Sequence, residues 1–294
     1  MQVIFTATLG RNGSQNLVDL FNRVGIDCVA EHEPPDLPLR QLGYLPFFRN
    51  RGWLGPGSRT AMIGRNFQRR FLAPDEMVGR GRALEWVARG DAVRLADLAQ
   101  RRVRRLHKFA RRGYRNYLEA GPYFLRTYGE ETWRLLPGLG LIKLTRQPLA
   151  NAKSFVNRQK VIWQNALPPD SPGNILRIDG WERLSKLQLY LYLWCETELK
   201  FAAFVERHAV TRVFRLDTPD LSDRARIEEM FRYFGIQHRP LADLAPTNTA
   251  ATHGKDATII TDEDVRAYYE FLNLVPANLL ERIEYLKKYA PKAG

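Results

Sequence analysis

The feature that most constrains the fold is a short apolar segment that runs directly into a glycine-containing turn. Residues 2–8 (QVIFTAT) have the β-rich, apolar composition of a buried strand. Residues 10–14 then read Gly-Arg-Asn-Gly-Ser, and apolar side chains recur at helical spacing from residue 14 to residue 24. A strand, a glycine turn and a helix in this order are typical of chains that alternate β and α elements.

The rest of the chain also alternates short apolar segments with longer helical patterns. This alternation predicts a three-layer α/β fold, in which helices flank a mainly parallel sheet of about five strands. We expect strands at residues 2–8, 27–31, 140–145, 174–178 and 211–216. We expect helices at residues 14–24, 76–98, 100–118, 149–164, 181–208, 222–234, 262–273 and 277–289. The pattern predicts a single domain over residues 1–294, with a helical insertion at roughly 37–118.

The composition is that of an ordinary globular protein, with 45% apolar and 26% charged residues. Cys28 and Cys195 both lie in apolar periodic stretches, so we expect two buried thiols and a reducing compartment. No apolar run approaches the length of about 18 residues that spans a membrane, and no leader-like segment opens the sequence. We therefore expect a cytoplasmic protein.

The net charge of +13 predicts an attraction for anions. The charge is concentrated at residues 101–115, where eight of fifteen positions are Arg or Lys and apolar residues recur at helical spacing. This pattern predicts an amphipathic helix with one basic face. Two interpretations stay open: a solvated face or partner surface, and a peripheral contact of residues 100–118 with acidic ligands or anionic membranes.

The glycine turn at residues 10–14 has the features of an anion-binding site. The first N–H groups of a helix lack intrahelical partners, and the helix dipole favours negative charge there. Gly10 and Gly13 permit a close backbone approach, Ser14 can cap the helix and bond a phosphate oxygen, and Arg11 can add a forked cation. An ordinary strand-turn-helix corner would show the same pattern. The lysine of a nucleotide-hydrolase phosphate loop is absent, which argues against ATP or GTP hydrolysis.

A second strand-to-helix turn far along the chain repeats this arrangement. The apolar segment that begins at residue 141 ends at Arg146, and Pro148 is well placed to begin a helix that carries Ser154. Arg146 and Ser154 lie on either side of the turn and could hold one anion between them, although Arg146 alone could also be a surface residue in a salt bridge. Two anion sites at the carboxyl ends of parallel strands fit a ligand with two separated phosphates.

Together the two motifs resemble those of the sulfotransferases that use 3′-phosphoadenosine 5′-phosphosulfate (PAPS) as donor. Those enzymes have a loop similar to Gly-Arg-Ser-Gly-Thr/Ser and, later, Arg-x-Pro followed by a Ser eight residues after the Arg. Residues 29–36 (VAEHEPPD) resemble the Glu-Pro of the carbohydrate-sulfotransferase branch, and residues 212–236 resemble the family's late strand and helix. The likeness is closer to the carbohydrate and bacterial type than to the cytosolic type, and it implies a P-loop-like fold.

The resemblance implies a role for each motif residue. Residues 10–15 would wrap the 5′-phosphosulfate, with Arg11 also stabilising the charge that builds on the bridging oxygen as the sulfuryl group leaves. Arg146 and Ser154 would hold the 3′-phosphate, and Lys255 resembles a late basic residue that also touches it. No metal is implied. The donor-binding residues expected from the resemblance are Gly10, Arg11, Asn12, Gly13, Ser14, Gln15, Arg146, Ser154 and Lys255.

The acceptor side requires a base that draws a proton from the attacking group. We expect Glu33 in that role, at the end of the second predicted strand. His32 is adjacent, and neighbouring residues of an extended segment face opposite ways, so only one of the two would face the donor. Glu119 and Tyr123 could line the acceptor pocket. The expected acceptor is a hydroxyl or amine of a glycan, a glycolipid or a small natural product.

Two other classes of protein remain as alternatives. A P-loop-type nucleotide kinase would share the strand-turn-helix motif, but it would need a lysine or another magnesium site that the sequence does not display. A non-enzymatic protein that binds nucleic acid or membrane surfaces through residues 100–118 would explain the charge, but it would leave both anion motifs without a role.

Overall fold

A computed structural model describes residues 1–32, 82–157, 167–241 and 259–289 of the chain. Its strands form one sheet in the order β2-β3-β1-β4-β5, and all four neighbouring pairs are parallel. The predicted α/β class with a mainly parallel sheet of five strands is therefore confirmed. The strands are β1 (Gln2–Ala7), β2 (Cys28–His32), β3 (Asn116–Ala120), β4 (Gly140–Thr145) and β5 (Val213–Asp217).

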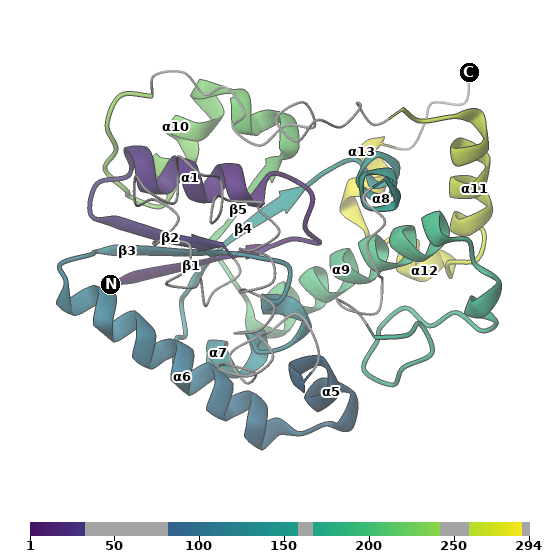
Figure 1. Cartoon of the computed structure of the whole chain (residues 1–294), viewed down its shortest axis with the longest axis horizontal. Helices are drawn as coiled ribbons and strands as arrows, with labels where there is room; N and C mark the ends of the chain where they lie inside the picture. Colours follow the sequence, from purple (N-terminus) through teal and green to yellow (C-terminus); the bar gives the residue numbers. More distant parts are fainter. Residues whose placement is uncertain (33–81, 158–166, 242–258, 290–294) are drawn as a thin grey trace, which may run out of the picture.

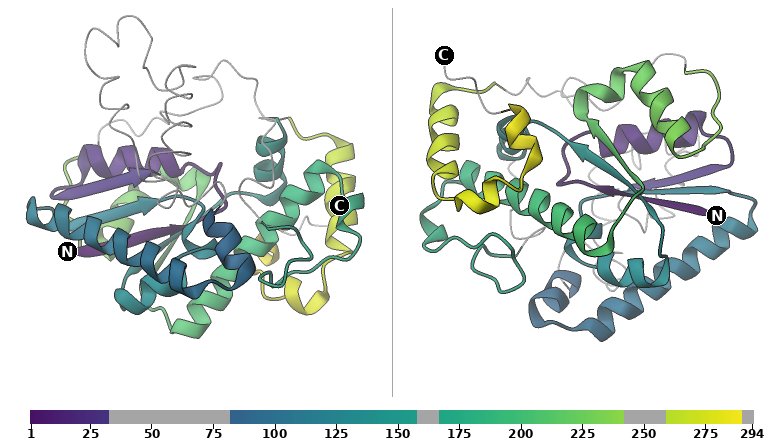
Figure 2. Two further views of the ribbon diagram at one scale, coloured as in Figure 1. Left: turned by 60° about the horizontal axis from the view of Figure 1, so that its bottom comes forward. Right: turned by 180° about the vertical axis from the view of Figure 1, so that it is seen from behind.

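Helices cover both faces of the sheet, as the three-layer prediction requires (Figure 1). The helices α1 (Ser14–Val24) and α10 (Arg224–Tyr233) lie on one face, and α6 (Ala92–Arg111) and α7 (Gly129–Leu135) lie on the other. A third group packs beside the carboxyl ends of the strands (Figure 2). Its members are α8 (Pro148–Val156), α9 (Lys186–His208), α11 (Asp262–Leu272), α12 (Ala277–Leu280) and α13 (Glu284–Tyr289). The helix α5 (Arg82–Arg89) packs with α6 instead. Short 3₁₀ helices are η2 (Phe124–Arg126), η4 (Trp181–Arg183) and η5 (Thr218–Ser222).

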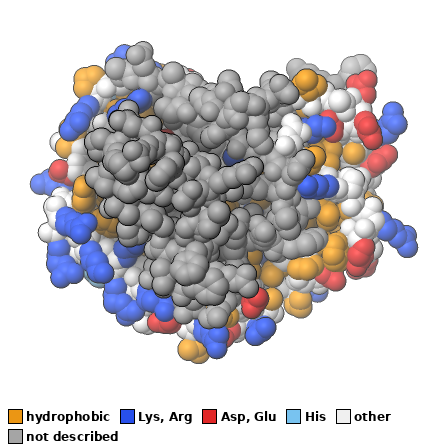
Figure 3. Space-filling view, viewed as in Figure 1, with side chains coloured by type: hydrophobic (Ala, Val, Ile, Leu, Met, Phe, Trp, Pro, Cys, Tyr) orange, Lys and Arg blue, Asp and Glu red, His pale blue; other side chains and the backbone are white. Residues whose placement is uncertain are grey.

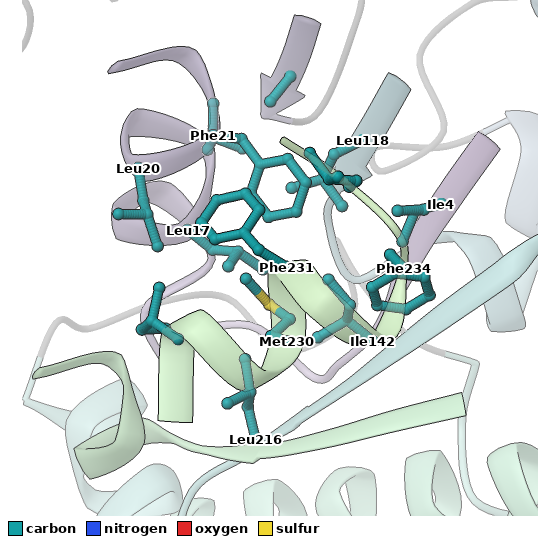
Figure 4. Packing of buried hydrophobic residues seen from close by; sticks show 14 of the residues in the cluster. Ile4, Leu17, Leu20, Phe21, Leu118, Ile142, Leu216, Met230, Phe231 and Phe234 are labelled. Carbon is teal, nitrogen blue, oxygen red and sulfur yellow. The ribbon is translucent and has the colours of Figure 1, made fainter. Parts of the chain in front are cut away.

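The core follows from the alternation of side chains along the strands. Ile4 of β1 faces the α1 and α10 layer, whereas its neighbour Phe5 belongs to the cluster beneath α6 and α7. In the first layer, Phe21 of α1 and Phe231 of α10 meet with ring centroids 5.1 Å apart (Figure 4). Burial of these large apolar side chains fixes how both helices lie on the sheet, and with them the loop that precedes α1.

Several of the predicted elements differ from the structure. The helix predicted over residues 76–98 is divided, because α5 ends at Arg89 and α6 begins at Ala92, and the helix predicted over residues 277–289 is divided into α12 and α13. Residues 174–178 do not form a strand, because the N–H groups of Ile175 and Leu176 donate to the carboxylate of Glu196 on α9, at 3.1 and 2.8 Å, instead of to a neighbouring strand. The helix predicted over residues 100–118 ends at Arg111, and residues 116–120 form β3. Gly113, with φ of +89°, turns the chain between the two elements.

The predicted helical insertion at roughly 37–118 is described only from residue 82 onwards, where it contains α5, α6 and the start of β3, and it stays a prediction. Its remainder lies outside the described residues, and the single domain over 1–294 stays a prediction. Within the described ranges, no helix combines the length and the apolar character that crossing a membrane requires. Both Cys28 and Cys195 are free and buried, as expected.

Candidate active site

The loop between β1 and α1 has an unusual backbone. Gly10, Arg11 and Gly13 all have positive φ, at 99°, 59° and 90°. Such a conformation strains a residue with a side chain, and strain of this kind is concentrated at functional sites. A Cβ atom on Gly13 would lie 2.3 Å from Leu221 Cδ1, so the loop accepts only glycine there. The backbone conformation therefore favours glycine at both positions of the motif, and packing against Leu221 adds to this at Gly13 alone.

Gly13 precedes the first residue of α1, and no side chain caps the helix from that position. By contrast, side chains cap the helices α6, α8, α9, α10 and α11. The first turn of α1 carries the positive end of the helix dipole, which favours an anion at this position. The expected capping role of Ser14 is wrong: it is the first helical residue, and its Oγ lies 3.0 Å from His32 Nε2.

Two side chains of the motif form hydrogen bonds with the protein itself. Asn12 is 2% exposed, and its amide donates to the Leu144 carbonyl of β4 and to the Thr8 hydroxyl. Gln15 donates to Asp19 Oδ1 one turn along α1, at 2.8 Å. The expectation that the Asn12 side chain bonds phosphate is therefore corrected, because that side chain is buried and already engaged with the protein. The expected phosphate contact of Gln15, which is half-buried, stays a prediction. Their backbone positions remain part of the loop.

The two predicted anion motifs lie side by side. Arg146, at the end of β4, donates from Nη1 to the Arg11 carbonyl at 3.2 Å. Asn151 on α8 donates to the Gly10 carbonyl at 3.0 Å. Because β1 and β4 are adjacent parallel strands, both loops emerge at the same edge of the sheet. The second motif therefore supports the backbone of the first.

Arg146 is a cation in a poorly solvated position. Burial lowers the pKa of its guanidinium, and no carboxylate pairs with it in the described part of the chain. Ser154, on the same helix as Asn151, is 7% exposed, and its hydroxyl has no protein partner within the described ranges. A half-buried guanidinium and an unengaged hydroxyl beside an open helix terminus are suited to hold an anion.

Two supporting residues were not predicted. Asn151 is fully buried one turn before Ser154, and its position in the second motif was the available sequence signal. Thr218, at the start of η5, places its hydroxyl 3.1 Å from both the Asn12 and Thr145 carbonyls. No local pattern marks Thr218, because both of its partners are distant in the sequence.

Of the residues predicted for the acceptor side, His32 is the one that lies against the loop between β1 and α1, through its contact with Ser14 Oγ. We call this loop the donor loop, after its proposed role. Tyr123 is partly exposed and follows Pro122, whose side chain would lie 3.8 Å from a Cβ on Gly10. The segment after β3 therefore borders the loop, as a pocket-lining role for Tyr123 requires. The predicted residues Glu33 and Lys255 lie outside the described residues.

Glu119 is not a residue of an open pocket. It is 5% exposed and accepts hydrogen bonds from Arg102 at 2.8 Å, from Tyr117 at 3.2 Å and from Tyr128. Burial raises the pKa of its carboxyl. Its predicted role in acceptor binding is corrected, because every oxygen of the carboxylate already has a donor from the protein.

The same buried network holds the end of β2. Glu31, directly opposite Glu119 in the register of β2 and β3, accepts from Tyr117 OH at 2.9 Å and from two nitrogens of Arg105. Glu31 faces α6, so its neighbour His32 faces the opposite side, where α1 begins. The network of Arg102, Arg105 and the two carboxylates thus fixes the strand that carries His32. Among the described residues, no group of three His, Cys, Asp or Glu side chains could hold a metal ion.

No family model and no curated protein matches the sequence. Among solved structures, the chain is similar to the sulfotransferase domain of the curacin biosynthetic pathway, at 12% identity over 100% of this chain and 98% of that one, with a TM-score of 0.49. It is similar to a sulfotransferase from Alicyclobacillus acidocaldarius, at 11% identity over 97% and 95% of the two chains, with a TM-score of 0.47. It is also similar to the sulfotransferase domain of the Synechococcus PCC 7002 olefin synthase, at 14% identity over 100% and 95%, with a TM-score of 0.49. All three are sulfotransferases, the family that the sequence motifs resemble.

Proposed function

We propose that the chain is a sulfotransferase that moves the sulfuryl group of PAPS to a hydroxyl or amine of a glycan, glycolipid or small natural product. The proposal rests on the environment of Arg146, a half-buried cation that pairs with no carboxylate in the described ranges. Its guanidinium contacts the backbone of a glycine loop at the uncapped start of α1. A desolvated cation and an open helix terminus, side by side, favour a ligand with two anionic groups.

The residues present fit the donor at both of its anionic ends. The N–H groups at the start of α1 and the Arg11 side chain would hold the 5′-phosphosulfate, and Arg146 with the Ser154 hydroxyl would hold the 3′-phosphate. Asn151 and Thr218 would keep the loop carbonyls in place, since they bond Gly10 and Asn12. When bound, the donor supplies a sulfuryl group on an oxygen that leaves as phosphate.

The protein's own groups would then handle charge and protons. Arg11 would face the negative charge that develops on the bridging oxygen as the bond from that oxygen to sulfur breaks. In this proposal the Ser14 hydroxyl turns from His32 Nε2 to an oxygen of the bound donor, and the freed lone pair of Nε2 would take the proton of the acceptor group as the new bond to sulfur forms and the bond from sulfur to the bridging oxygen breaks. The expectation that Glu33 is the base stays a prediction, to be tested in parallel.

The alternatives have less support. A nucleotide kinase would need a lysine in the loop, yet Ser14 follows Gly13 directly. A purely non-enzymatic role would give no function to the strained loop or to Arg146, which pairs with no carboxylate in the described ranges. Lys255 is retained as a proposed contact for the 3′-phosphate, and no metal is required for this chemistry.

The experiment is transfer of ³⁵S from labelled PAPS to a panel of phenols, amino sugars, oligosaccharides and glycolipids. We expect label in at least one acceptor, and none from γ-labelled ATP. His32→Asn should lower transfer by about 100-fold, with adenosine 3′,5′-bisphosphate still bound normally. Loss of transfer in Glu33→Gln but not in His32→Asn would assign the base to Glu33. Arg183→Ala, at an exposed arginine of η4, is the matched control and should transfer normally.

A further inference from the structure

The end of the molecule opposite the donor loop is built from four chain segments that lie side by side. Gln2 N–H donates to the Arg115 carbonyl at 2.8 Å, and Arg115 N–H donates to the Asp27 carbonyl at 2.9 Å. Ile26 N–H donates to the Gln237 carbonyl at 2.9 Å, which adds the segment after α10. We call this region, where β1, β2 and β3 begin, the strand-start surface; it comprises residues 1–2, 25–27, 108–116 and 236–239. All the strands are parallel, and β1, β2 and β3 begin at this surface. The donor loop follows the carboxyl end of β1 and therefore lies at the opposite end of the sheet.

Exposed cations gather on the strand-start surface. Lys108, Arg111, Arg112 and Arg239 are exposed and form no ion pair with any part of the chain that the structure describes. Arg115 is also exposed and pairs with Asp27 at 3.5 Å, where both side chains remain open to solvent. Lys and Arg side chains are seen along the rim where α6 and the strand starts lie (Figure 3). The charge is therefore left without neutralisation over several neighbouring segments.

Two large apolar side chains are exposed among these cations. Met1 is 43% exposed and Ile26 is 38% exposed. The backbone bonds of Gln2 to Arg115 and of Ile26 to Gln237 keep both beside the basic segments. Exposed apolar side chains within a cationic surface match the interface of a bilayer, where anionic headgroups overlie the apolar acyl region.

We propose that the strand-start surface docks on an anionic lipid membrane, with the cations at the headgroups and Met1 and Ile26 entering the interface. The cations come from α6, from the turn before β3 and from the segment after α10. They therefore cover a broad surface, as a membrane contact requires, and do not form a single row along one element. The aromatic residues of this part, Phe109 and Tyr114, are half-buried and contact each other edge to face at 6.2 Å, which does not provide a base-stacking platform. Docked in this way, the protein would hold its donor loop away from the bilayer. This proposal does not depend on the proposed enzymatic activity.

The experiment is sedimentation of the full chain with vesicles of phosphatidylcholine, with and without phosphatidylserine. We expect binding only to the anionic vesicles, falling as salt is raised. The triple variant Lys108→Glu, Arg111→Glu, Arg112→Glu should lose at least about 100-fold in vesicle affinity, because each removed cation contributes to headgroup attraction. Ile26→Ser should lose about threefold, since less apolar surface enters the interface. Circular dichroism melts of each variant check that the fold is kept.

A matched triple variant, Arg183→Glu, Lys186→Glu, Arg266→Glu, changes the net charge equally at exposed sites away from this surface. It should bind anionic vesicles as the unmodified protein does. Equal losses in both triple variants would show that net charge alone is responsible and would overturn the proposal. Absence of binding to anionic vesicles, or tighter binding to a single-stranded RNA or to polyglutamate than to vesicles, would also overturn it.

Discussion

Arg146 donates a hydrogen bond to the carbonyl oxygen of Arg11, over 3.2 Å, although the two residues are 135 positions apart in the sequence. The contact joins the ends of β4 and β1, which are neighbours in the sheet. A ligand held by the guanidinium of Arg146 therefore lies against the loop at the start of α1. This relationship brings two separate motifs together, as the proposed site for a ligand with two anionic groups requires.

The proposed role of Arg146 in holding a 3′-phosphate predicts a selective loss of affinity. In Arg146→Ala, the affinity for adenosine 3′,5′-bisphosphate should fall by about 10- to 100-fold, the range of a charge-assisted hydrogen bond. The affinity for AMP, which lacks the 3′-phosphate, should fall by no more than about threefold. Isothermal titration calorimetry with both ligands measures the difference. Equal losses would mean that Arg146 only supports the loop carbonyl of Arg11.

Gly13 is expected to be irreplaceable for two separable reasons. Gly13→Ala places a side chain at φ of +90° and a Cβ 2.3 Å from Leu221 Cδ1. Gly138, at φ of +91°, has open space around it, so Gly138→Ala carries the backbone cost of about 1–2 kcal/mol alone. Urea unfolding should show an additional loss of about 1–3 kcal/mol in Gly13→Ala. Adding Leu221→Ala should restore donor binding in part; no restoration would contradict the packing explanation.

Thr218 should act on the donor loop through the backbone. Thr218→Val removes the hydroxyl that lies 3.1 Å from the Asn12 and Thr145 carbonyls, so bisphosphate affinity should fall about fivefold. Thr132 offers a matched control, because its buried hydroxyl has no partner among the described residues. Thr132→Val should leave affinity unchanged and be neutral or slightly stabilising. Unchanged affinity in Thr218→Val would exclude Thr218 as a support of the loop.

Asp264 should make stability depend on pH at the acidic end. Burial acts to raise the pKa of this carboxyl, but hydrogen bonds from Lys153 and Thr261 outweigh burial, so its pKa lies below the ordinary 3.8. A carboxylate with a lowered pKa stabilises the fold at neutral pH and loses that contribution as the pH falls through the lowered value. Asp264→Asn should therefore lower the free energy of unfolding by about 1 kcal/mol at neutral pH, and by less below about pH 3.

Urea unfolding of Asp264→Asn and of the unmodified protein, at neutral and acidic pH, measures this difference. Asp262→Asn is the control, since Asp262 is an exposed acid in the first turn of the same helix. A deficit in Asp264→Asn that is the same at both pH values would point to packing and not to charge as its cause.

Where local sequence determined an element, the sequence predicted it closely. The strand at 140–145 is predicted with the observed ends because its apolar run is continuous, and all six residues of β4 are buried. The helix at 14–24 likewise coincides with α1. The strand at 116–120 was missed because it follows a basic helical pattern and contains Glu119. That carboxylate is tolerated inside the protein only because Arg102, from α6, reaches it.

The site shows the same difference between what local sequence determines and what distant contacts determine. The glycine turn and the Arg146 motif were found because each is a local pattern, and the structure brings the two together. The side-chain roles of Asn12 and Glu119 were mistaken because their partners, the Leu144 carbonyl and Arg102, come from distant segments. A sequence pattern shows which residue types are available at a site, whereas tertiary contacts decide which of them are already engaged.

The most direct test of the central claim is a thermal-shift comparison of adenosine 3′,5′-bisphosphate with ATP and Mg²⁺. A ligand that binds the folded chain at about 100 times its Kd stabilises it by about 2.7 kcal/mol, which is a shift of several degrees in Tm. The account predicts this shift for the bisphosphate, a smaller one for AMP and none specific to ATP with Mg²⁺. Stabilisation by ATP with Mg²⁺ alone would contradict it.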